Sequence, residues 1–401
     1  ASSVIVKGGS STNAFTIDNA GAGTVTYYGQ SLADVVTITN AASTGLVTIY
    51  GEAGDDVIIG SVAKDVISAG AGADTITATA GNDVITGGAD IDTYSTTEAL
   101  MIANSGTTAT FDGGDGVDII DFSEDDVVNV VDADFRGFTS VATLTTGDGT
   151  NNVVFGTNAS AAGIVTVTGG SGNDTLVLTN MTTETTVNGG GGDDQITGSA
   201  VKDIINGEAG LDIITATAGN DVITGGADID TYSTTEALMI ANSGTTATFD
   251  GGDGVDIIDF SEDDVVNVVD ADFRGFTSVA TLTTGDGTNN VVLGTNASAA
   301  GIVTVTGGSG ADTLDLSAMT NATTVNAAAG ADVITAATGA ITTINNTAGD
   351  VDKIITSAIT SAGYFNSVSN FAVAADVLDY NGAVLNGTGA VVAGSEDGTA
   401  R

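Results

Sequence analysis

The chain has 401 residues, of which 7 are Lys or Arg and 51 are Asp or Glu, so its formal net charge is −44. It contains no His, Cys, Pro or Trp, which excludes Ser-His-Asp and Cys-His triads, disulfides and zinc sites of the usual type. The charge also argues against nucleic acid as a partner, because that partner requires a basic surface. Hydrophobic residues make up 42% of the chain without a run of roughly 20 apolar residues, which predicts a folded β protein with no membrane insertion.

Residues 1–28 contain strand-like segments but no repeat motif. They suit either a cap on the end of a β array or a strand donated to a neighbouring subunit, and the sequence does not separate these two interpretations. No charged-then-apolar leader follows Ala1, so an amino-terminal export signal is not expected.

From Gly51 the sequence divides into five nonapeptides without a slip: GEAGDDVII, GSVAKDVIS, AGAGADTIT, ATAGNDVIT and GGADIDTYS. A second set of five begins at Gly189, and isolated copies begin at residues 113, 169, 251, 307 and 327. The eighth residue of every copy is apolar and the sixth is Asp. These sixth-position residues are Asp56, Asp65, Asp74, Asp83, Asp92, Asp118, Asp174, Asp194, Asp203, Asp212, Asp221, Asp230, Asp256, Asp312 and Asp332.

The residue types at these positions favour calcium chemistry. Gly permits positive φ and close backbone approach, so that loop carbonyls can converge. Asp supplies a hard carboxylate, and Ca²⁺ prefers six to eight such oxygen ligands. The apolar eighth residue alternates with polar neighbours, as a strand with one buried face requires.

The nonapeptide resembles the G-G-x-G-x-D-x-U-x repeat of the RTX family, in which U is a large apolar residue. The resemblance implies a parallel β-roll in which a six-residue loop precedes a three-residue strand, two nonapeptides complete a right-handed turn, and Ca²⁺ ions lie between loops 18 residues apart. The expected stacked pairs are Asp56–Asp74, Asp65–Asp83, Asp74–Asp92, Asp194–Asp212, Asp203–Asp221 and Asp212–Asp230.

The resemblance implies that the sixth-position Asp residues are calcium ligands, together with backbone carbonyls of loop residues such as Gly51, Gly54, Gly70, Gly72, Gly87, Gly189, Gly207 and Gly225. The loops that begin at Gly60 and Gly198 have Ala63 and Val201 where the fourth Gly is expected. The sites of Asp65 and Asp203 are therefore expected to be less complete.

A comparison of magnitudes indicates that the metal is needed for folding. One buried Ile contributes roughly 1.5–3 kcal/mol, whereas ordering nine backbone units costs on the order of 9–18 kcal/mol. A row of carboxylates adds mutual repulsion. We therefore expect multiple Ca²⁺ ions to bind and to stabilise the fold.

Residues 122–168 and their copy, 260–306, lack nonapeptides and alternate apolar with polar residues between Gly, Asn and Asp turns. This pattern predicts strands of about five residues. Residues 96–104 fit either a short helix or a further solenoid strand. Arg136 and Arg274 are expected to form ion pairs with Asp132 and Asp270.

The phrase Phe135-Arg-Gly-Phe138, repeated at Phe273, is similar to an element of RTX-type surface-layer proteins of Gram-negative bacteria, although Thr139 stands where that family often has an acidic residue. Lys64 and Lys202 lie inside repeat loops, where they either replace a cation or face solvent.

Residues 76–172 match residues 214–310 at a constant offset of 138, with one difference, Phe155 against Leu293, in 97 positions. We predict a cap or assembly strand over 1–28, a first unit over 29–168 with its repeat block at 51–95, and a near-identical second unit over 169–306 with its block at 189–233. A diverged third unit and carboxy-terminal cap occupy 307–401. The predicted fold is all-β: an elongated right-handed parallel β-solenoid with calcium-binding β-roll blocks and little or no helix.

The sequence favours a secreted, calcium-dependent structural protein with no enzymatic activity. We expect it to lie outside a bacterial cell or on its surface, as a surface layer, filament or matrix fibre, with export by type I secretion as the resemblance implies. The expected partners are copies of itself and a surface polysaccharide. The alternative is an adhesin or a polysaccharide-binding RTX module of a larger secreted protein, for which Tyr27, Tyr28 and Phe155 are candidate contact residues.

Overall fold

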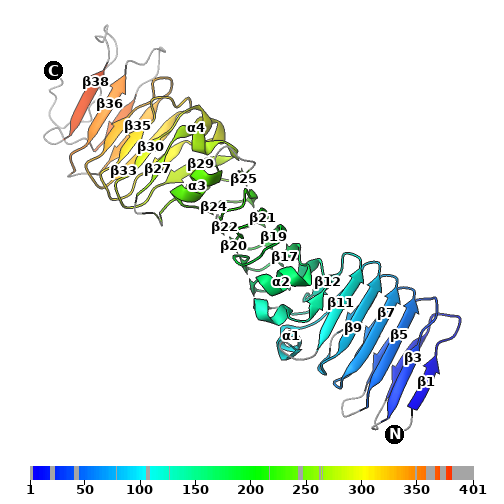
Figure 1. Cartoon of the computed structure of the whole chain (residues 1–401). Helices are drawn as coiled ribbons and strands as arrows, with labels where there is room; N and C mark the ends of the chain where they lie inside the picture. The colour runs from blue at the N-terminus through cyan, green and yellow to red at the C-terminus, as the bar shows by residue number, and fades with distance from the viewer. Residues whose placement is uncertain are drawn as a thin grey trace. The chain divides into compact units, whose positions relative to one another are not determined.

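The computed structural model describes residues 3–18, 23–39, 45–77, 79–104, 109–125, 127–215, 217–242, 247–261, 263, 265–347, 350–357, 366–370 and 376–381. Two compact units divide the chain, Ala1–Ile205 and Asn206–Arg401. Both are built from a parallel β-solenoid, of which the chain makes about 16 turns with 9% helix (Figure 1). The predicted solenoid fold is confirmed.

The first unit contains β1 (Ser3–Lys7), β2 (Ala14–Ile17), β3 (Thr24–Tyr28), β4 (Val35–Ile38), β5 (Val47–Ala53), β6 (Val57–Ile59), β7 (Asp65–Ala71), β8 (Thr75–Thr77), β9 (Val84–Ala89), β10 (Thr93–Ser95), α1 (Glu98–Asn104), β11 (Thr110–Asp115), β12 (Ile119–Asp121), β13 (Asn129–Val130), the 3₁₀ helix η1 (Asp132–Phe135), β14 (Phe138–Thr139), β15 (Thr143–Thr145), β16 (Asn152–Val154), α2 (Thr157–Ala162), β17 (Thr166–Thr168), β18 (Thr175–Val177), β19 (Thr185–Gly191) and β20 (Gln195–Thr197). Strand β21 (Asp203–Ala209) follows.

The second unit continues with β22 (Ile213–Thr215), β23 (Val222–Ala227), β24 (Thr231–Ser233), α3 (Glu236–Asn242), β25 (Thr248–Asp253), β26 (Asp256–Asp259), β27 (Asn267–Val268), η2 (Asp270–Phe273), β28 (Phe276–Thr277), β29 (Val279–Thr283), β30 (Asn290–Val292), α4 (Thr295–Ala300), β31 (Thr304–Thr306), β32 (Thr313–Asp315), β33 (Thr323–Ala328), β34 (Val333–Thr335), β35 (Thr342–Asn346), β36 (Lys353–Ser357), β37 (Ser367–Ser369) and β38 (Val377–Asn381).

Strands of the first repeat block pair in register one turn apart. In one sheet β6, β8 and β10 are parallel neighbours, with Ile58 opposite Ile76 and Ile76 opposite Tyr94. In the other sheet β5, β7 and β9 are parallel neighbours, with Ile67 opposite Ile85. The chain therefore changes sheet at every nonapeptide and returns after 18 residues, as the repeat predicted.

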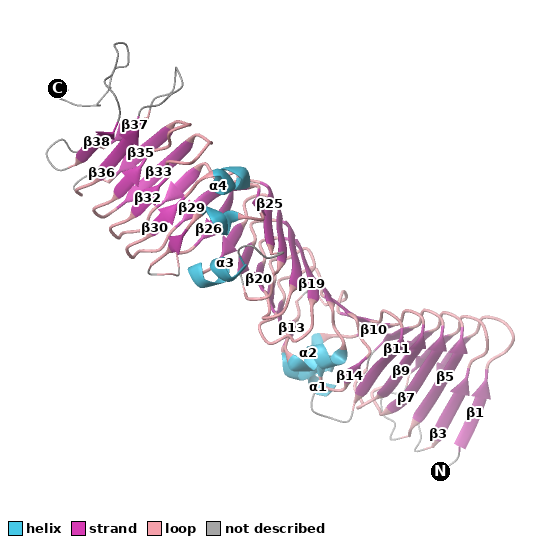
Figure 2. Cartoon of the chain, turned by 45° about the horizontal axis from the view of Figure 1, so that its top comes forward, coloured by secondary structure: helices cyan, strands magenta, loops and turns pink. Residues whose placement is uncertain are grey.

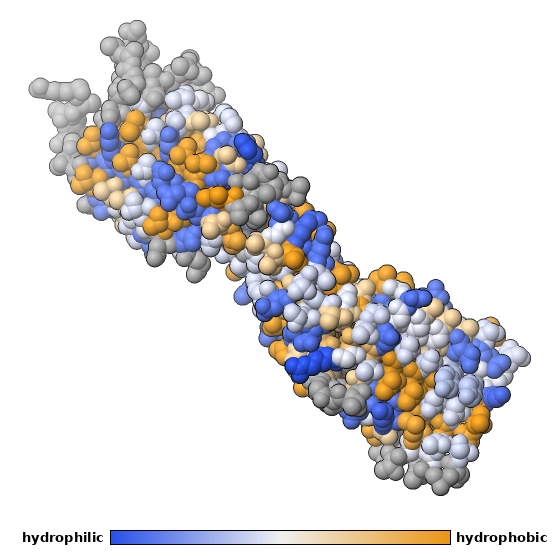
Figure 3. Space-filling model, viewed as in Figure 1, coloured by the Kyte–Doolittle hydropathy of each residue, from blue (hydrophilic) through white to orange (hydrophobic). Residues whose placement is uncertain are grey.

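The eighth-position side chains form the core of the roll. Ile58, Ile76 and Ile120 are fully buried, and Ile67 and Ile85 are 2% exposed. Because only one large apolar side chain per nonapeptide points inward, this core is a narrow double column. Outward-facing residues of the same strands are apolar in places, and Figure 3 shows such residues interspersed with hydrophilic ones.

The strands differ in length between the two sheets. Strands β6, β8 and β10 have three residues, as predicted, but β5 and β7 have seven, because the pairing continues into the following loop. At that point Glu52 pairs with Gly70, and Gly70 pairs with Gly88. In one of the two sheets, the strands thus form more backbone hydrogen bonds with their neighbours than the predicted three-residue strands would.

Short helices interrupt the strands between the repeat blocks (Figure 2). Of the two alternatives for residues 96–104, the structure has the short helix, α1, and α3 repeats it. The two copies of a further helix, α2 and α4, lie where only strands were expected. Among the described residues no helix is both long and apolar enough to cross a membrane.

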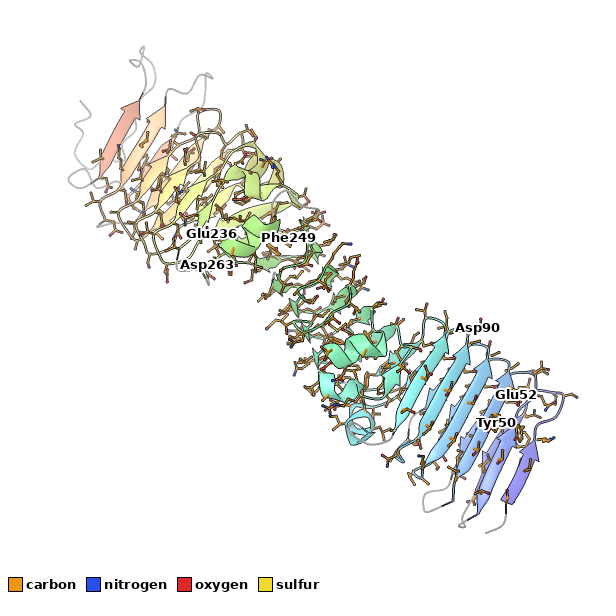
Figure 4. All side chains as sticks on the ribbon, viewed as in Figure 1. Tyr50, Glu52, Asp90, Glu236, Phe249 and Asp263 are labelled. Atoms are coloured by element: carbon orange, nitrogen blue, oxygen red, sulfur yellow. The ribbon has the colours of Figure 1, made fainter. Side chains whose placement is uncertain are left out.

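Aspartates from neighbouring turns cap these helices. In the second unit the backbone N–H of Glu236, in the first turn of α3, donates to Oδ2 of Asp263 (2.7 Å), and Figure 4 shows the two residues close together. In the first unit Oδ1 of Asp132 accepts the N–H groups of Asn158 and Ala159, each at 3.0 Å, at the start of α2. Caps of this kind satisfy the free donors of a helix amino terminus.

The predicted ion pair between Arg136 and Asp132 is wrong, as is its copy at Arg274 and Asp270. Both carboxylates accept hydrogen bonds from the helices that follow them. The capping role explains the difference, because backbone N–H groups at a helix start compete with a guanidinium for the same oxygens.

Candidate calcium-binding rows

The sixth-position Asp residues form hydrogen-bonded rows along the solenoid. The backbone N–H of Asp56 donates to Oδ1 of Asp74 (2.7 Å), that of Asp74 to Asp92 (2.9 Å), and that of Asp92 to Asp118 (2.8 Å). The same bond joins Asp65 to Asp83, Asp174 to Asp194, Asp212 to Asp230, Asp230 to Asp256 and Asp312 to Asp332. Each of these carboxylates therefore uses its Oδ1 atom to accept a backbone N–H from the preceding turn.

The other oxygen of these carboxylates has no hydrogen-bond partner in most of the row. Among the described residues, a buried and unpartnered Oδ2 atom is found in Asp56, Asp74, Asp92, Asp118, Asp230, Asp256, Asp312 and Asp332. All eight residues are at most 1% exposed. Burying a charged acceptor without a donor is strongly unfavourable, so the row as built requires a positively charged partner.

Six of the eight unpartnered oxygens face a carbonyl of the next turn across a glycine. In the other two nonapeptides, those of Asp74 and Asp332, the first residue is Ala69 or Ala327. A Cβ atom added to Gly225 would lie 2.4 Å from Oδ2 of Asp230 and 2.5 Å from the carbonyl oxygen of Gly251. A Cβ atom on Gly87 would meet Oδ2 of Asp92 and the Gly113 carbonyl at the same two distances. The first-position glycine therefore leaves room for an oxygen-lined cradle between two consecutive loops.

Glycines at the second and fourth positions serve a different purpose, because the loop backbone is left-handed there. Gly70 and Gly72 have φ of 128° and 127°. Where the sequence lacks glycine, Glu52 and Asp90 adopt φ of 79°, and Figure 4 shows both at the loop edge of the strands. The loop geometry is thus imposed on residues that disfavour it.

Burial raises the pKa of the row carboxylates. The pKa of Asp74 and of Asp230 rises to about 7, and that of Asp56 and of Asp92 to about 6. Desolvation is the main cause, and repulsion from neighbouring Asp residues adds to it. These groups favour a proton or a cation over an uncompensated charge.

The donor set of the cradle fits Ca²⁺. It consists only of carboxylate and carbonyl oxygens, which are the ligands of this hard cation. Among the described residues no group of three acidic side chains gathers at one point, so a bound ion would take most of its ligands from the backbone. Of the predicted carbonyls, those of Gly189 and Gly225 share a cradle with Asp174 and Asp212.

The loops in which Ala63 and Val201 replace the fourth glycine are chemically different. The Ser61 N–H donates to Oδ2 of Asp65 (2.6 Å), and its hydroxyl donates to Oδ1 (3.2 Å). Ser199 donates to Oδ2 of Asp203 through its N–H (2.7 Å) and its hydroxyl (2.8 Å). In these two loops serine donors therefore compensate the carboxylate charge. Calcium ligation by Asp65, Asp83, Asp203 and Asp221, as by the other sixth-position Asp residues, stays a prediction.

The lysines in these loops lie at the surface. Nζ of Lys202 forms an ion pair with Oε1 of Glu184 (2.8 Å), and both side chains are well exposed. Lys64 is exposed as well. The solvent-facing alternative holds for both side chains, although the charge of Lys64 acts against the burial that raises the pKa of Asp83.

The rows extend beyond the residues that the repeat identified. Asp34 precedes Asp56 in the first row, and its N–H donates to Oδ1 of Asp56 (2.7 Å). Asp352 and Asp376 continue the row that begins at Asp312 and Asp332. A glycine five residues before Asp34 was the sequence signal, but the spacing of 22 residues to Asp56 departs from the nonapeptide register.

Comparison with known families gives one result. The family model described as the RTX calcium-binding nonapeptide repeat (four copies) matches residues 41–63, 59–94, 186–205, 197–232 and 298–318. No curated protein matches the chain. The matched ranges contain the stacked loops of both repeat blocks, and repeats of this family bind calcium. Residues 41–94, 186–232 and 298–318 of this chain are therefore similar to RTX calcium-binding nonapeptide repeats.

Proposed function

We propose that this protein is a secreted, calcium-dependent structural protein that assembles outside the bacterial cell as a surface layer, filament or matrix fibre. The observation that carries the proposal is that eight buried carboxylate oxygens of the Asp rows have no hydrogen-bond donor. RTX repeats are characteristic of secreted proteins exported by type I secretion. A protein of this kind meets abundant calcium only after export.

Calcium availability then controls folding. Without the ion, the charged rows oppose the packing of one turn on the next. With it, binding free energy becomes folding free energy. The chain stays exportable where calcium is scarce and becomes rigid where calcium is plentiful.

Self-association is supported by the repetition of the surface. Two stretches of 97 residues differ at one position, so the chain presents the same loops twice. Acidic side chains on the outer side of these loops, such as Asp115 and its copy Asp253, are exposed. Cations shared between such loops of two copies would neutralise both surfaces.

Electron microscopy of the purified chain in calcium and in EGTA tests the assembly. We expect ordered sheets or fibres in calcium and their loss in EGTA. Monomers that persist in calcium at high protein concentration would contradict the structural role. If equilibrium dialysis showed that the chain binds no calcium, both the proposed calcium-dependent folding and the proposed assembly would be contradicted.

A polysaccharide-binding module is the second candidate, and one observation favours it. The rings of Tyr28 and Tyr50 stack with centroids 4.9 Å apart and an interplanar angle of 11°, and Tyr50 is 37% exposed. Of the other predicted contacts, Tyr27 and Phe155 are fully buried and belong to the core. Glycan-array binding that is lost in Tyr50→Ala would support this module.

A further inference from the structure

Two asparagines occupy the position that Asp takes in the calcium rows. Asn151 and Asn289 are fully buried and end the loops 146–151 and 284–289, both Thr-Gly-Asp-Gly-Thr-Asn. These loops keep Gly at the second and fourth positions but have Asn at the sixth. The N–H of Asn151 donates to Oδ1 of Asp174 (2.8 Å), as a row Asp would to the next turn.

The orientation of the amide is fixed by its neighbours. Oδ1 of Asn151 accepts the backbone N–H of Val128 (2.8 Å), so Nδ2 must be the atom that points into the loop. In the other copy Oδ1 of Asn289 accepts the N–H of Val266, also at 2.8 Å.

Four oxygens surround that nitrogen. Nδ2 of Asn151 lies 2.8 Å from the Gly147 carbonyl, 2.9 Å from the Gly149 carbonyl, 2.9 Å from Oδ1 of Asp174 and 3.2 Å from the hydroxyl of Thr146. Nδ2 of Asn289 has the same four partners in its own copy, at 2.8 to 3.3 Å. An amide has only two hydrogens to share among four acceptors. The position of this nitrogen is thus surrounded by carbonyl oxygens of its own loop and a carboxylate oxygen of the next turn. Such oxygens are the ligands that a hard cation prefers.

We propose that the side-chain amides of Asn151 and Asn289 stand in for calcium, so that these two turns fold without metal, and that each loop is a latent calcium site which Asn→Asp opens. The inference rests on the proposed calcium-dependent folding. In the variant, a carboxylate replaces the donor amide at the centre of the oxygens. The loop then lacks its internal donor and has the negative charge and the space to bind an ion.

The test compares the wild-type chain, Asn151→Asp, Asn289→Asp and the double variant. Bound calcium is counted by equilibrium dialysis and isothermal titration calorimetry, and thermal unfolding is followed with and without EGTA. The matched control is Asn152→Asp, since Asn152 is the adjacent residue and its side chain is exposed. It adds the same charge outside the loop.

We expect one additional ion for each single variant, two for the double variant and none for the control. In EGTA with trimethylamine N-oxide, which favours the compact state, the melting temperature of Asn151→Asp should fall by about 3 °C relative to the control, and calcium should restore it. Unchanged stoichiometry, or failure of the variants to fold at millimolar calcium, would overturn the inference. The wild-type ion count is read separately, so a wild-type chain that binds no calcium refutes the proposed function instead.

Discussion

Replacing Asp230 by Asn should change stability in opposite directions with and without calcium. Asn keeps an oxygen for the N–H of Asp212, which donates to Oδ1 of Asp230 at 3.0 Å. The new amide nitrogen takes the place of the unpartnered Oδ2 and faces the Gly251 carbonyl across Gly225. A repulsive pair of oxygens therefore becomes a donor and an acceptor.

The magnitude follows from the pKa of this carboxyl, which burial raises from 3.8 to about 7. At about 1.4 kcal/mol for each tenfold change in proton affinity, the charge destabilises the calcium-free fold by at most ~4 kcal/mol at pH 8. Water near the loop screens part of this, so we expect Asp230→Asn to gain about 1–3 kcal/mol in EGTA. In calcium at a hundredfold excess over its dissociation constant, loss of one site removes about 2.7 kcal/mol.

Thermal and urea unfolding at pH 8 measure both effects. The EGTA series contains trimethylamine N-oxide, which favours the compact state. The control is Asp228→Asn, which removes the same charge from an exposed side chain of the same loop and already has a φ of 80° that Asn tolerates. A shift of the same sign in calcium and in EGTA, or equal shifts in Asp230→Asn and the control, would refute the reasoning.

Three further predictions concern the loops. In EGTA the fold should be most stable below about pH 4 and lose stability as pH rises through about 6–7, because the pKa of Asp74 in the folded chain, about 7, lies above its unfolded value of 3.8; urea melts from pH 4 to 8 measure this, and a stability that rises over that range would contradict it. Glu208→Gly should stabilise the chain by roughly 0.5–1 kcal/mol, because Glu208 has a φ of 79°, whereas Glu184→Gly, outside such a loop position, should not. Ser199→Ala should destabilise the chain by about 1 kcal/mol equally in calcium and in EGTA, because the lost hydroxyl donates to Asp203; a loss confined to EGTA would show that calcium occupies this loop.

The sequence predicted the register and the core because both follow from a strict period. Ile58 lies over Ile76 one turn later, and both are buried as the eighth position requires. The rows of Asp side chains follow from the same period, since a fixed repeat length brings equal positions together. The fourth position of each loop also carried information, because the loops with Ala63 or Val201 there use Ser61 and Ser199 in hydrogen bonds to their aspartates.

Features that depend on contacts between turns of unequal length could not be read from the period. Helix α2 is capped by Asp132, which lies 26 residues before Asn158. A cap at this distance leaves no pattern in the local sequence of the helix. Asn151 lies in a loop that keeps two glycines but has Asn at the sixth position. The nonapeptide pattern, which requires Asp there, therefore does not include this loop. Its role depends on Val128, 23 residues earlier, which fixes the direction of the amide.

The most direct measurement is the far-ultraviolet circular dichroism and melting profile of the chain during removal and return of calcium. The account predicts that EGTA abolishes most of the β signal at pH 8 and that calcium restores it together with a higher melting temperature. An unchanged spectrum and an unchanged melting temperature in EGTA would contradict it, because the buried carboxylates would then be stable without any cation.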